Sequence, residues 1–209
     1  YQGLADTRAL NGRTGTLLLD PADILINPGN TTNGSFDGED FFGSAYGGPV
    51  LIGWDDVVTQ LGFSNAILST ANAFTDVGSG NITIAGPSPD LTSTNRLELI
   101  AENNILVNGS ISNTQAGDIV MHAGYSGGFY SSGGGITLNA PISTLGLVSL
   151  NSGGNITQNA AASISANALL ANSANGAVSL DAAMNQVGTL AGSAIGSFAF
   201  KNSGNLIIG

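Results

Sequence analysis

The chain of 209 residues contains one histidine, His122, around which any imidazole-based catalysis would have to be built. A nucleophilic triad needs a serine next to the imidazole and a carboxylate that orients the ring. Asp118 is four residues away in the sequence. On an extended strand these two side chains would share a face but lie about 13 Å apart. We therefore predict that His122 is a surface or turn residue, and that the chain has no catalytic residue.

Acidic residues form two close pairs and one short cluster. Hydrolysis of a glycosidic bond requires two carboxyl groups about 5–10 Å apart around the bond. The pairs are Asp20/Asp23 and Asp55/Asp56, and the cluster is Asp37-Gly38-Glu39-Asp40. The strings Gly-Asp-Asp, Gly-His-Gly and Arg-x-Pro-x-x-Arg, typical of β-helical polysaccharide hydrolases and lyases, do not occur. We predict that the chain is not an enzyme and that these carboxylates lie in solvated turns.

The acidic cluster also offers oxygen atoms of the kind that Ca²⁺ binds. Asp37, Glu39 and Asp40 lie within the segment NGSFDGEDFF. They lack the ligand spacing of an EF-hand, and the Gly-Gly-x-Gly-x-Asp repeat of calcium-binding β-rolls is absent. We predict no metal site and no cofactor, with a calcium site on these three residues as the alternative.

Seven of the thirteen aromatic residues gather in two segments rich in Gly and Ser. Exposed aromatic side chains beside Gly and Ser suit the binding of carbohydrate or protein surfaces. The alternative is that they fold down and cover the flank of the fold. The predicted ligand contacts are Phe41, Phe42 and Tyr46 in segment 28–48, and Tyr125, Phe129 and Tyr130 in segment 123–135.

Charged residues make up 9% of the chain and the net charge is −10. The cations are limited to Arg8, Arg13, Arg96 and Lys201. Binding of nucleic acid depends on Lys and Arg that neutralise phosphates, so we predict no nucleic-acid partner. A polybasic contact with an anionic membrane surface is excluded for the same reason.

Short apolar pairs separated by one residue recur along the chain, and a second pair begins eight residues after the first. Such units start at Leu97, Val148 and Phe198, which are 51 and 50 residues apart. Alternation with period two over three to five residues predicts a short strand with one buried face. Many such strands at a near-fixed period indicate a solenoid. We predict an all-β protein, a parallel β-helix of roughly ten coils.

Three segments depart from this pattern. Segments 28–48 and 123–135 are rich in Gly and turn residues, and we predict them to be loop insertions. Residues 54–62 begin with two aspartates and continue with apolar residues at helical spacing, which predicts a short helix that ends at Gly62.

The strand pattern also predicts which side chains point into the helix. Stacked coils place like residues about 4.8 Å apart, where equal charges repel and Asn, Ser and Thr can form hydrogen-bonded ladders. The predicted inward residues are Leu97, Leu99, Ile105, Val107, Ile119, Ile136, Val148, Leu150, Ile156, Val178, Leu180, Phe198, Phe200, Leu206 and Ile208.

Residues 151–209 carry a recurrent series of short elements. These are Ile156-Thr157-Gln158, an Ala-rich run from Ile164 to Leu170, Val178-Ser179-Leu180, Asn185-Gln186-Val187 and Leu206-Ile207-Ile208. The series resembles the repeats of filamentous-haemagglutinin-like exoproteins of Gram-negative bacteria. The upstream strings GTLLLDPADILIN and LELIAENNILVNGSI are similar to elements of the same family. The resemblance covers most of the chain outside the two insertions.

The resemblance implies a right-handed β-helix that is secreted by the two-partner route, through an outer-membrane transporter. Residues 1–209 would then be one β-helical segment of a longer exoprotein that is secreted or held at the cell surface. Its expected function is that of an adhesin or biofilm-matrix scaffold whose partners are host or bacterial surface glycans or proteins. A structural shaft or self-assembling filament, joined end to end, is the first alternative. A carbohydrate-active enzyme is the second.

Overall fold

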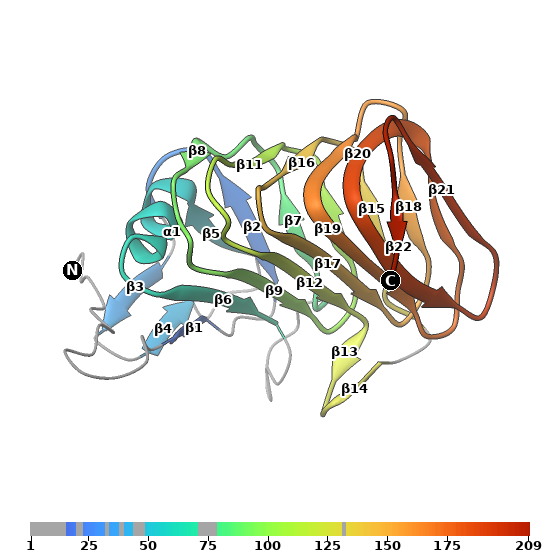
Figure 1. The fold of residues 1–209 in the computed structure, drawn as a ribbon. Coiled ribbons are helices and arrows are strands. Elements are labelled where there is room, and N and C mark those ends of the chain that lie inside the picture. The colour runs from blue at the N-terminus through green and yellow to red at the C-terminus, as the bar shows by residue number, and fades with distance from the viewer. Residues whose placement is uncertain are drawn as a thin grey trace.

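The computed structural model describes residues 16–19, 23–31, 34–37, 40–43, 49–70, 79–130 and 133–209, and only the backbone of 16–19, 34–37 and 40–43. Eighteen strands form one sheet that winds into a parallel β-helix, as the alternating pattern predicts. Figure 1 shows the strands as successive coils along one axis.

The coils form three walls, each a stack of parallel strands. The first wall is β5 (Val50–Gly53), β2 (Ile24–Asn27), β7 (Ile82–Ile84), β10 (Ile105–Val107), β15 (Ile136–Leu138), β18 (Ile156–Gln158), β20 (Val178–Ala194) and β21 (Phe198–Asn202). The second is β1 (Thr16–Leu19), β6 (Asn65–Ser69), β9 (Leu97–Ala101), β12 (Ile119–Ala123), β17 (Leu147–Ser152), β19 (Ile164–Ser173), β20 and β22 (Ile207–Ile208). The third is β8 (Asp90–Leu91), β11 (Ile111–Asn113), β16 (Ile142–Ser143) and the start of β19.

The first wall stacks eight strands in the part of the chain that the structure describes, where the sequence predicted roughly ten coils of about 20 residues. Consecutive stacked residues from Ile82 onward are Ile105, Ile136, Ile156, Val178 and Phe198, which are 23, 31, 20, 22 and 20 residues apart. Most coils are therefore longer than the expected minimum. The longest of these steps contains the insertion after β12.

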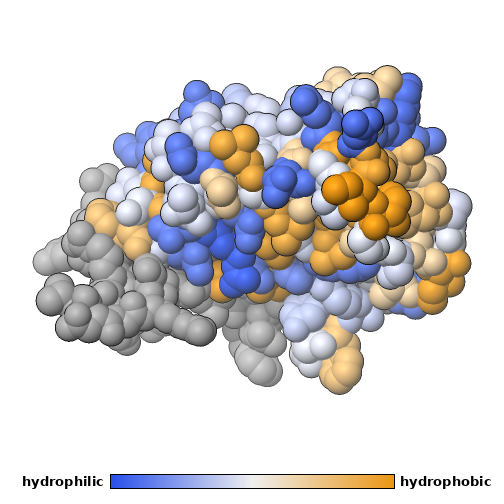
Figure 2. All heavy atoms as spheres, in the orientation of Figure 1, coloured by the Kyte–Doolittle hydropathy of each residue, from blue (hydrophilic) through white to orange (hydrophobic). Residues whose placement is uncertain are grey.

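One hydrophobic core runs through the coils from Ile24 to Leu190. The inward prediction is confirmed for the eleven residues from Leu97 to Leu180, each at most 1% exposed. It is wrong for Phe198 and Ile208, which are 38% and 71% exposed, while Phe200 and Leu206 pack partly against the core. These four lie on the last coil, which is stacked on one side only. Figure 2 shows apolar surface at this end of the molecule.

Helix α1 (Trp54–Leu61) lies beside β5 at the opposite end of the stack and confirms the predicted short helix. Trp54, Val57 and Leu61 share its buried face, and the indole Nε1 of Trp54 donates to the carbonyl of Gly86 at 3.1 Å. The helix ends where the Gly62 amide donates to Val58. The described residues include no helix that is long and apolar enough to cross a membrane.

Both predicted insertions contain an antiparallel hairpin. In 28–48, β3 (Gly34–Asp37) pairs with β4 (Asp40–Gly43). In 123–135, β13 (Tyr125–Ser126) pairs with β14 (Phe129–Tyr130). Gly127 and Gly128 have φ of +58° and +88°, the left-handed conformation that a tight two-residue turn requires at both positions. Figure 1 shows β13–β14 projecting from the body below β12 and β17.

Polar side chains on the turns and outer walls form the expected ladders. Asn104 donates to Asn81 at 3.1 Å, Asn139 to Asn108 at 2.7 Å, and Asn172 to Asn151 at 3.1 Å. Each ladder satisfies amide groups of neighbouring coils without placing equal charges over one another.

Candidate functional site

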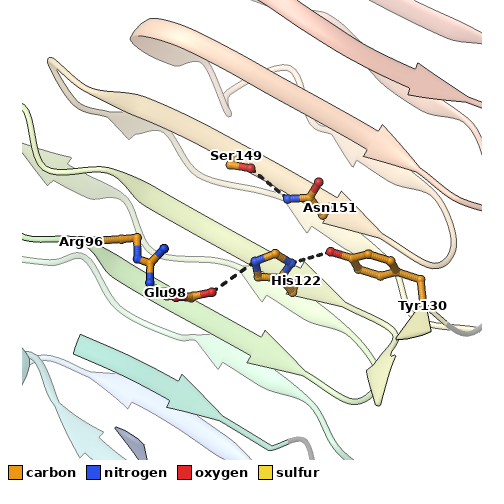
Figure 3. A network of polar contacts seen from close by, with 6 residues as sticks. All are labelled: Arg96, Glu98, His122, Tyr130, Ser149 and Asn151. Atoms are coloured by element: carbon orange, nitrogen blue, oxygen red, sulfur yellow. Dashed lines mark hydrogen bonds and ion pairs between the residues drawn. The ribbon is translucent and has the colours of Figure 1, made fainter. Parts of the chain in front are cut away.

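The base of hairpin β13–β14 meets the outer face of the second wall in a network of four polar side chains. The Glu98 carboxylate on β9 contacts Arg96 Nη2 at 2.8 Å and His122 Nε2 at 3.3 Å. The other ring nitrogen of His122, Nδ1, lies 2.5 Å from the Tyr130 hydroxyl on β14. Figure 3 shows these four residues, which we call the hairpin network, as a continuous chain.

The stacking of the coils explains how Glu98 and His122 meet. Strands β9 and β12 are parallel, with Glu98 beside Val120 and Ile100 beside His122. Glu98 and His122 therefore point outward from adjacent strands and sit on a diagonal, two residues out of step. The neighbouring strand β17 continues this face with Ser149, which accepts a hydrogen bond from Asn151 at 2.9 Å.

The hairpin turn returns Tyr130 to the side of Tyr125. The two residues are paired across the hairpin, and their ring centroids lie 5.1 Å apart. The His122 ring lies 5.7 Å from the Tyr125 centroid and 6.1 Å from the Tyr130 centroid, nearly parallel to the latter. Aromatic packing and the hydroxyl contact thus hold the hairpin against the wall together.

The charges of the network follow from its contacts. The hydrogen bond from His122 and the positive charge of Arg96 hold the pKa of Glu98 below its ordinary value, against the opposing effect of burial. Burial, Tyr125 and the negative charge of Glu98 raise the pKa of Tyr130 to about 12. At neutral pH Glu98 is therefore a carboxylate and Tyr130 a phenol.

These protonation states assign the donors. A carboxylate only accepts hydrogen bonds, so Nε2 of His122 carries the hydrogen that faces Glu98. In a neutral imidazole, Nδ1 then accepts from the Tyr130 hydroxyl. Since the phenol stays protonated far above neutral pH and its hydrogen is engaged, Tyr130 is a poor nucleophile. The arrangement is suited to fixing the hairpin in place.

We expect the Tyr130 contact to be lost at alkaline pH. Because its pKa in the folded chain is raised above 10.0, the phenol stabilises the hairpin fully below pH 10.0, and this contribution disappears as the pH rises through about 12. A titration of phenolate absorbance should show a late step that is absent from Tyr130→Phe. If Tyr130 titrated near 10.0 like an exposed tyrosine, its proposed burial against His122 would be wrong.

The structure places some of the residues predicted from sequence and leaves others outside its description. It brings Tyr125 and Tyr130 together and leaves Phe129 78% exposed at the hairpin tip. Phe41 and Phe42 lie on β4, Asp37 ends β3 and Asp40 begins β4, but their side chains fall outside the described residues, as do Glu39 and Tyr46 entirely. Within the described residues, no three His, Cys, Asp or Glu side chains lie together as a metal site would need.

His122 is half-buried on a strand, and its carboxylate partner is Glu98 rather than the sequence neighbour Asp118. The Asp118 carboxylate instead accepts the backbone N–H of Leu147 on the next coil at 2.9 Å. Sequence reasoning missed Glu98 and Arg96 because it searched near His122 along the chain. Aligning the strand LELIA with IVMHA as stacked repeats would have brought Glu98 next to His122.

The chain was compared with protein-family models, with curated proteins and with solved structures, and none of the three comparisons gave a match. Its function therefore has to be argued from the fold and from the hairpin itself.

Proposed function

We propose that this chain is part of a secreted or surface-attached β-helical exoprotein that binds surface glycans or proteins through hairpin β13–β14. The observation that carries the proposal is Phe129, 78% exposed at the tip of a hairpin whose base is tied to the shaft by Tyr130 and His122. Large aromatic side chains commonly act as anchors in binding sites.

The hairpin network supports this function by making the anchor rigid. A loop that is ordered before binding loses less conformational entropy when its ligand arrives. Gly127 and Gly128 fix the turn, while Tyr130 is held through His122 and Glu98 to the wall. The long parallel stack behind the hairpin adds a stiff support that displays it away from the axis.

The location and the export route rest on the repeats. The strings around Gln158, Asn185 and Val187 resemble filamentous-haemagglutinin-like exoproteins, from which we infer an outer-membrane transporter as the partner in secretion. In the structure the amides of these strings have a structural role. Gln158 Nε2 donates to Asn185 Oδ1 at 2.7 Å, and Asn185 Nδ2 donates to the Leu180 carbonyl at 2.8 Å inside the coil.

An enzyme is the less favoured alternative. The hairpin network contains one carboxylate, Glu98, and the hydrolysis of a glycosidic bond needs two. Both oxygens of Glu98 are also engaged, by Arg96 and by His122. A carboxylate held in this way is suited to positioning the imidazole.

We expect Phe129→Ser to weaken retention of the chain on an immobilised panel of polysaccharides and purified surface glycoproteins by about tenfold, the typical loss for a binding anchor. Ile195→Ser is the matched control, since Ile195 is 77% exposed at a distant turn. His122→Ala should also weaken retention, because it frees the hairpin without removing the anchor.

Each other result on the panel selects a different function. Equal retention of Phe129→Ser and the wild-type chain would remove the hairpin from the binding surface. No retention of the wild-type chain on any member would favour a bare structural shaft. Release of new chain ends from a polysaccharide would show enzyme activity.

A further inference from the structure

An open groove with a volume of about 490 Å³ lies at the corner where β16 is followed by β17. It is separate from the hairpin. The groove includes Thr144 and Leu145, which precede β17, whereas the hairpin follows Ala123, the partner of Ser152 at the far end of β17. Its volume falls in the range of small-molecule binding sites, roughly 300–1,000 Å³.

The groove is lined by residues of four successive coils and by no charged side chain. Three of its polar side chains are the amides of Asn167, Gln186 and Asn205. Each amide offers both donors and an acceptor. Within the described structure none of the three makes a side-chain hydrogen bond, while the neighbouring Asn202 amide is engaged with Val187 and Gly204.

These free amides are matched by an apolar element. Leu145 is 65% exposed at the edge of the groove. A sugar ring presents hydroxyl groups, which both donate and accept hydrogen bonds, around a skeleton with apolar C–H faces. Unpaired amides beside an exposed leucine complement both parts of such a ring.

The polar positions repeat along the axis with the spacing of the coils. Ser112, Ser143, Ser165 and Gln186 are stacked partners in consecutive coils, so they recur about every 4.8 Å. One sugar unit of an extended glycan has a similar length. A glycan chain lying parallel to the axis would therefore meet an equivalent polar group at each coil.

The absence of charge in the lining decides which glycan class fits. A uronate, sulfated or phosphorylated glycan would enter without a cationic partner and would approach a chain with a net charge of −10. We propose that this groove binds an uncharged oligosaccharide, with the amides of Asn167 and Gln186 as its main hydrogen-bonding groups. The site goes beyond the proposed hairpin function and stands without it.

The test is calorimetric titration of the 209-residue chain with uncharged hexasaccharides of glucose, mannose and N-acetylglucosamine, and with oligogalacturonate of equal length. We expect at least one uncharged oligosaccharide to bind and oligogalacturonate not to bind. The double variant Asn167→Ala/Gln186→Ala should weaken binding at least about tenfold. Both side chains are exposed, so its melting temperature should match that of the wild type.

Asn175→Ala is the matched control, because Asn175 is an exposed amide outside the groove, and it should bind as the wild type does. Phe129→Ser should also bind normally, which separates this site from the hairpin. Three outcomes would overturn the proposal. These are no heat with any uncharged oligosaccharide, unchanged affinity in the double variant, or equal binding of oligogalacturonate.

Discussion

Replacing Leu150 with aspartate is expected to destabilise the coils around β17 by about 5 kcal/mol or more. Leu150 is fully buried, stacked between Met121 on β12 and Ala171 on β19. The variant loses the packing of a buried leucine, which alone is worth about 2–5 kcal/mol, and places a carboxylate where no cation can reach it. A loss of this size rivals the total stability of a typical domain, about 5–15 kcal/mol.

The position of the damage should reflect the repeat architecture. Each coil of a solenoid contacts only its neighbours, so an unstable coil opens locally before the whole chain unfolds. Limited proteolysis and hydrogen exchange should show new exposure first in β12, β17 and β19. Leu145→Asp is the matched control, because Leu145 is 65% exposed and the same substitution there should change stability by less than about 0.5 kcal/mol. Equal melting temperatures for the two variants would contradict the inward position of Leu150.

The inward residues were predictable because the core imposes a period of two on each strand. Leu97 and Leu99 fill the core from β9, and Ile105 and Val107 fill it eight residues later from β10. The same pattern says nothing about how many coils lie beyond a strand. Phe198 repeats the motif of Val178, its stacked partner, yet it is exposed because no further coil covers it in the structure.

The hairpin network was harder to predict because outward residues carry no hydrophobic pattern. Their neighbours depend on the length of each coil, which varies. Glu98 lies near His122 because β9 and β12 begin 22 residues apart. The hairpin that supplies Tyr130 lengthens the coil step from Ile105 to Ile136 to 31 residues. A search by sequence distance finds Asp118, whereas a search by stacked position finds Glu98.

The two insertions differ in the same way from their prediction as loops. Gly and aromatic residues in 123–135 were read as turn signals, and Gly127 and Gly128 do form a turn. The flanking pairs, Tyr125–Ser126 and Phe129–Tyr130, are too short for a strand pattern to be recognised in sequence. Their pairing is stabilised by the contact of Tyr130 with His122, a residue of another element.

We expect Gly134→Ala to destabilise the chain by about 3 kcal/mol or more and to loosen the hairpin. Gly134 lies where the chain returns from the hairpin to the coil. A Cβ atom at this position would come closer than 3.0 Å to the backbone N and Cα of Gly124 and the carbonyl oxygen of Asn103. These are backbone atoms, which cannot rotate away as the end of a side chain can.

The overlap would fall on hydrogen bonds that close the base of the hairpin. The Gly124 amide donates to Asn103 at 2.7 Å, and the Gly134 carbonyl accepts from the Ser152 hydroxyl at 2.9 Å and from the Gly154 amide. Gly133→Ala is the adjacent control, because a Cβ atom there meets nothing within 4 Å. Restricting the unfolded chain should leave that variant unchanged or about 0.4–1 kcal/mol more stable.

The measurement is denaturant unfolding of both variants, followed by retention on the panel used for Phe129→Ser. Gly134→Ala should lose both stability and retention, while Gly133→Ala keeps both. The pairing matters because Phe129 is unchanged in each variant, so a loss of retention in Gly134→Ala alone would show that binding depends on how the hairpin is held. If Gly134→Ala were as stable as Gly133→Ala, the close backbone packing at the hairpin base would be wrong, and with it the rigid display of Phe129.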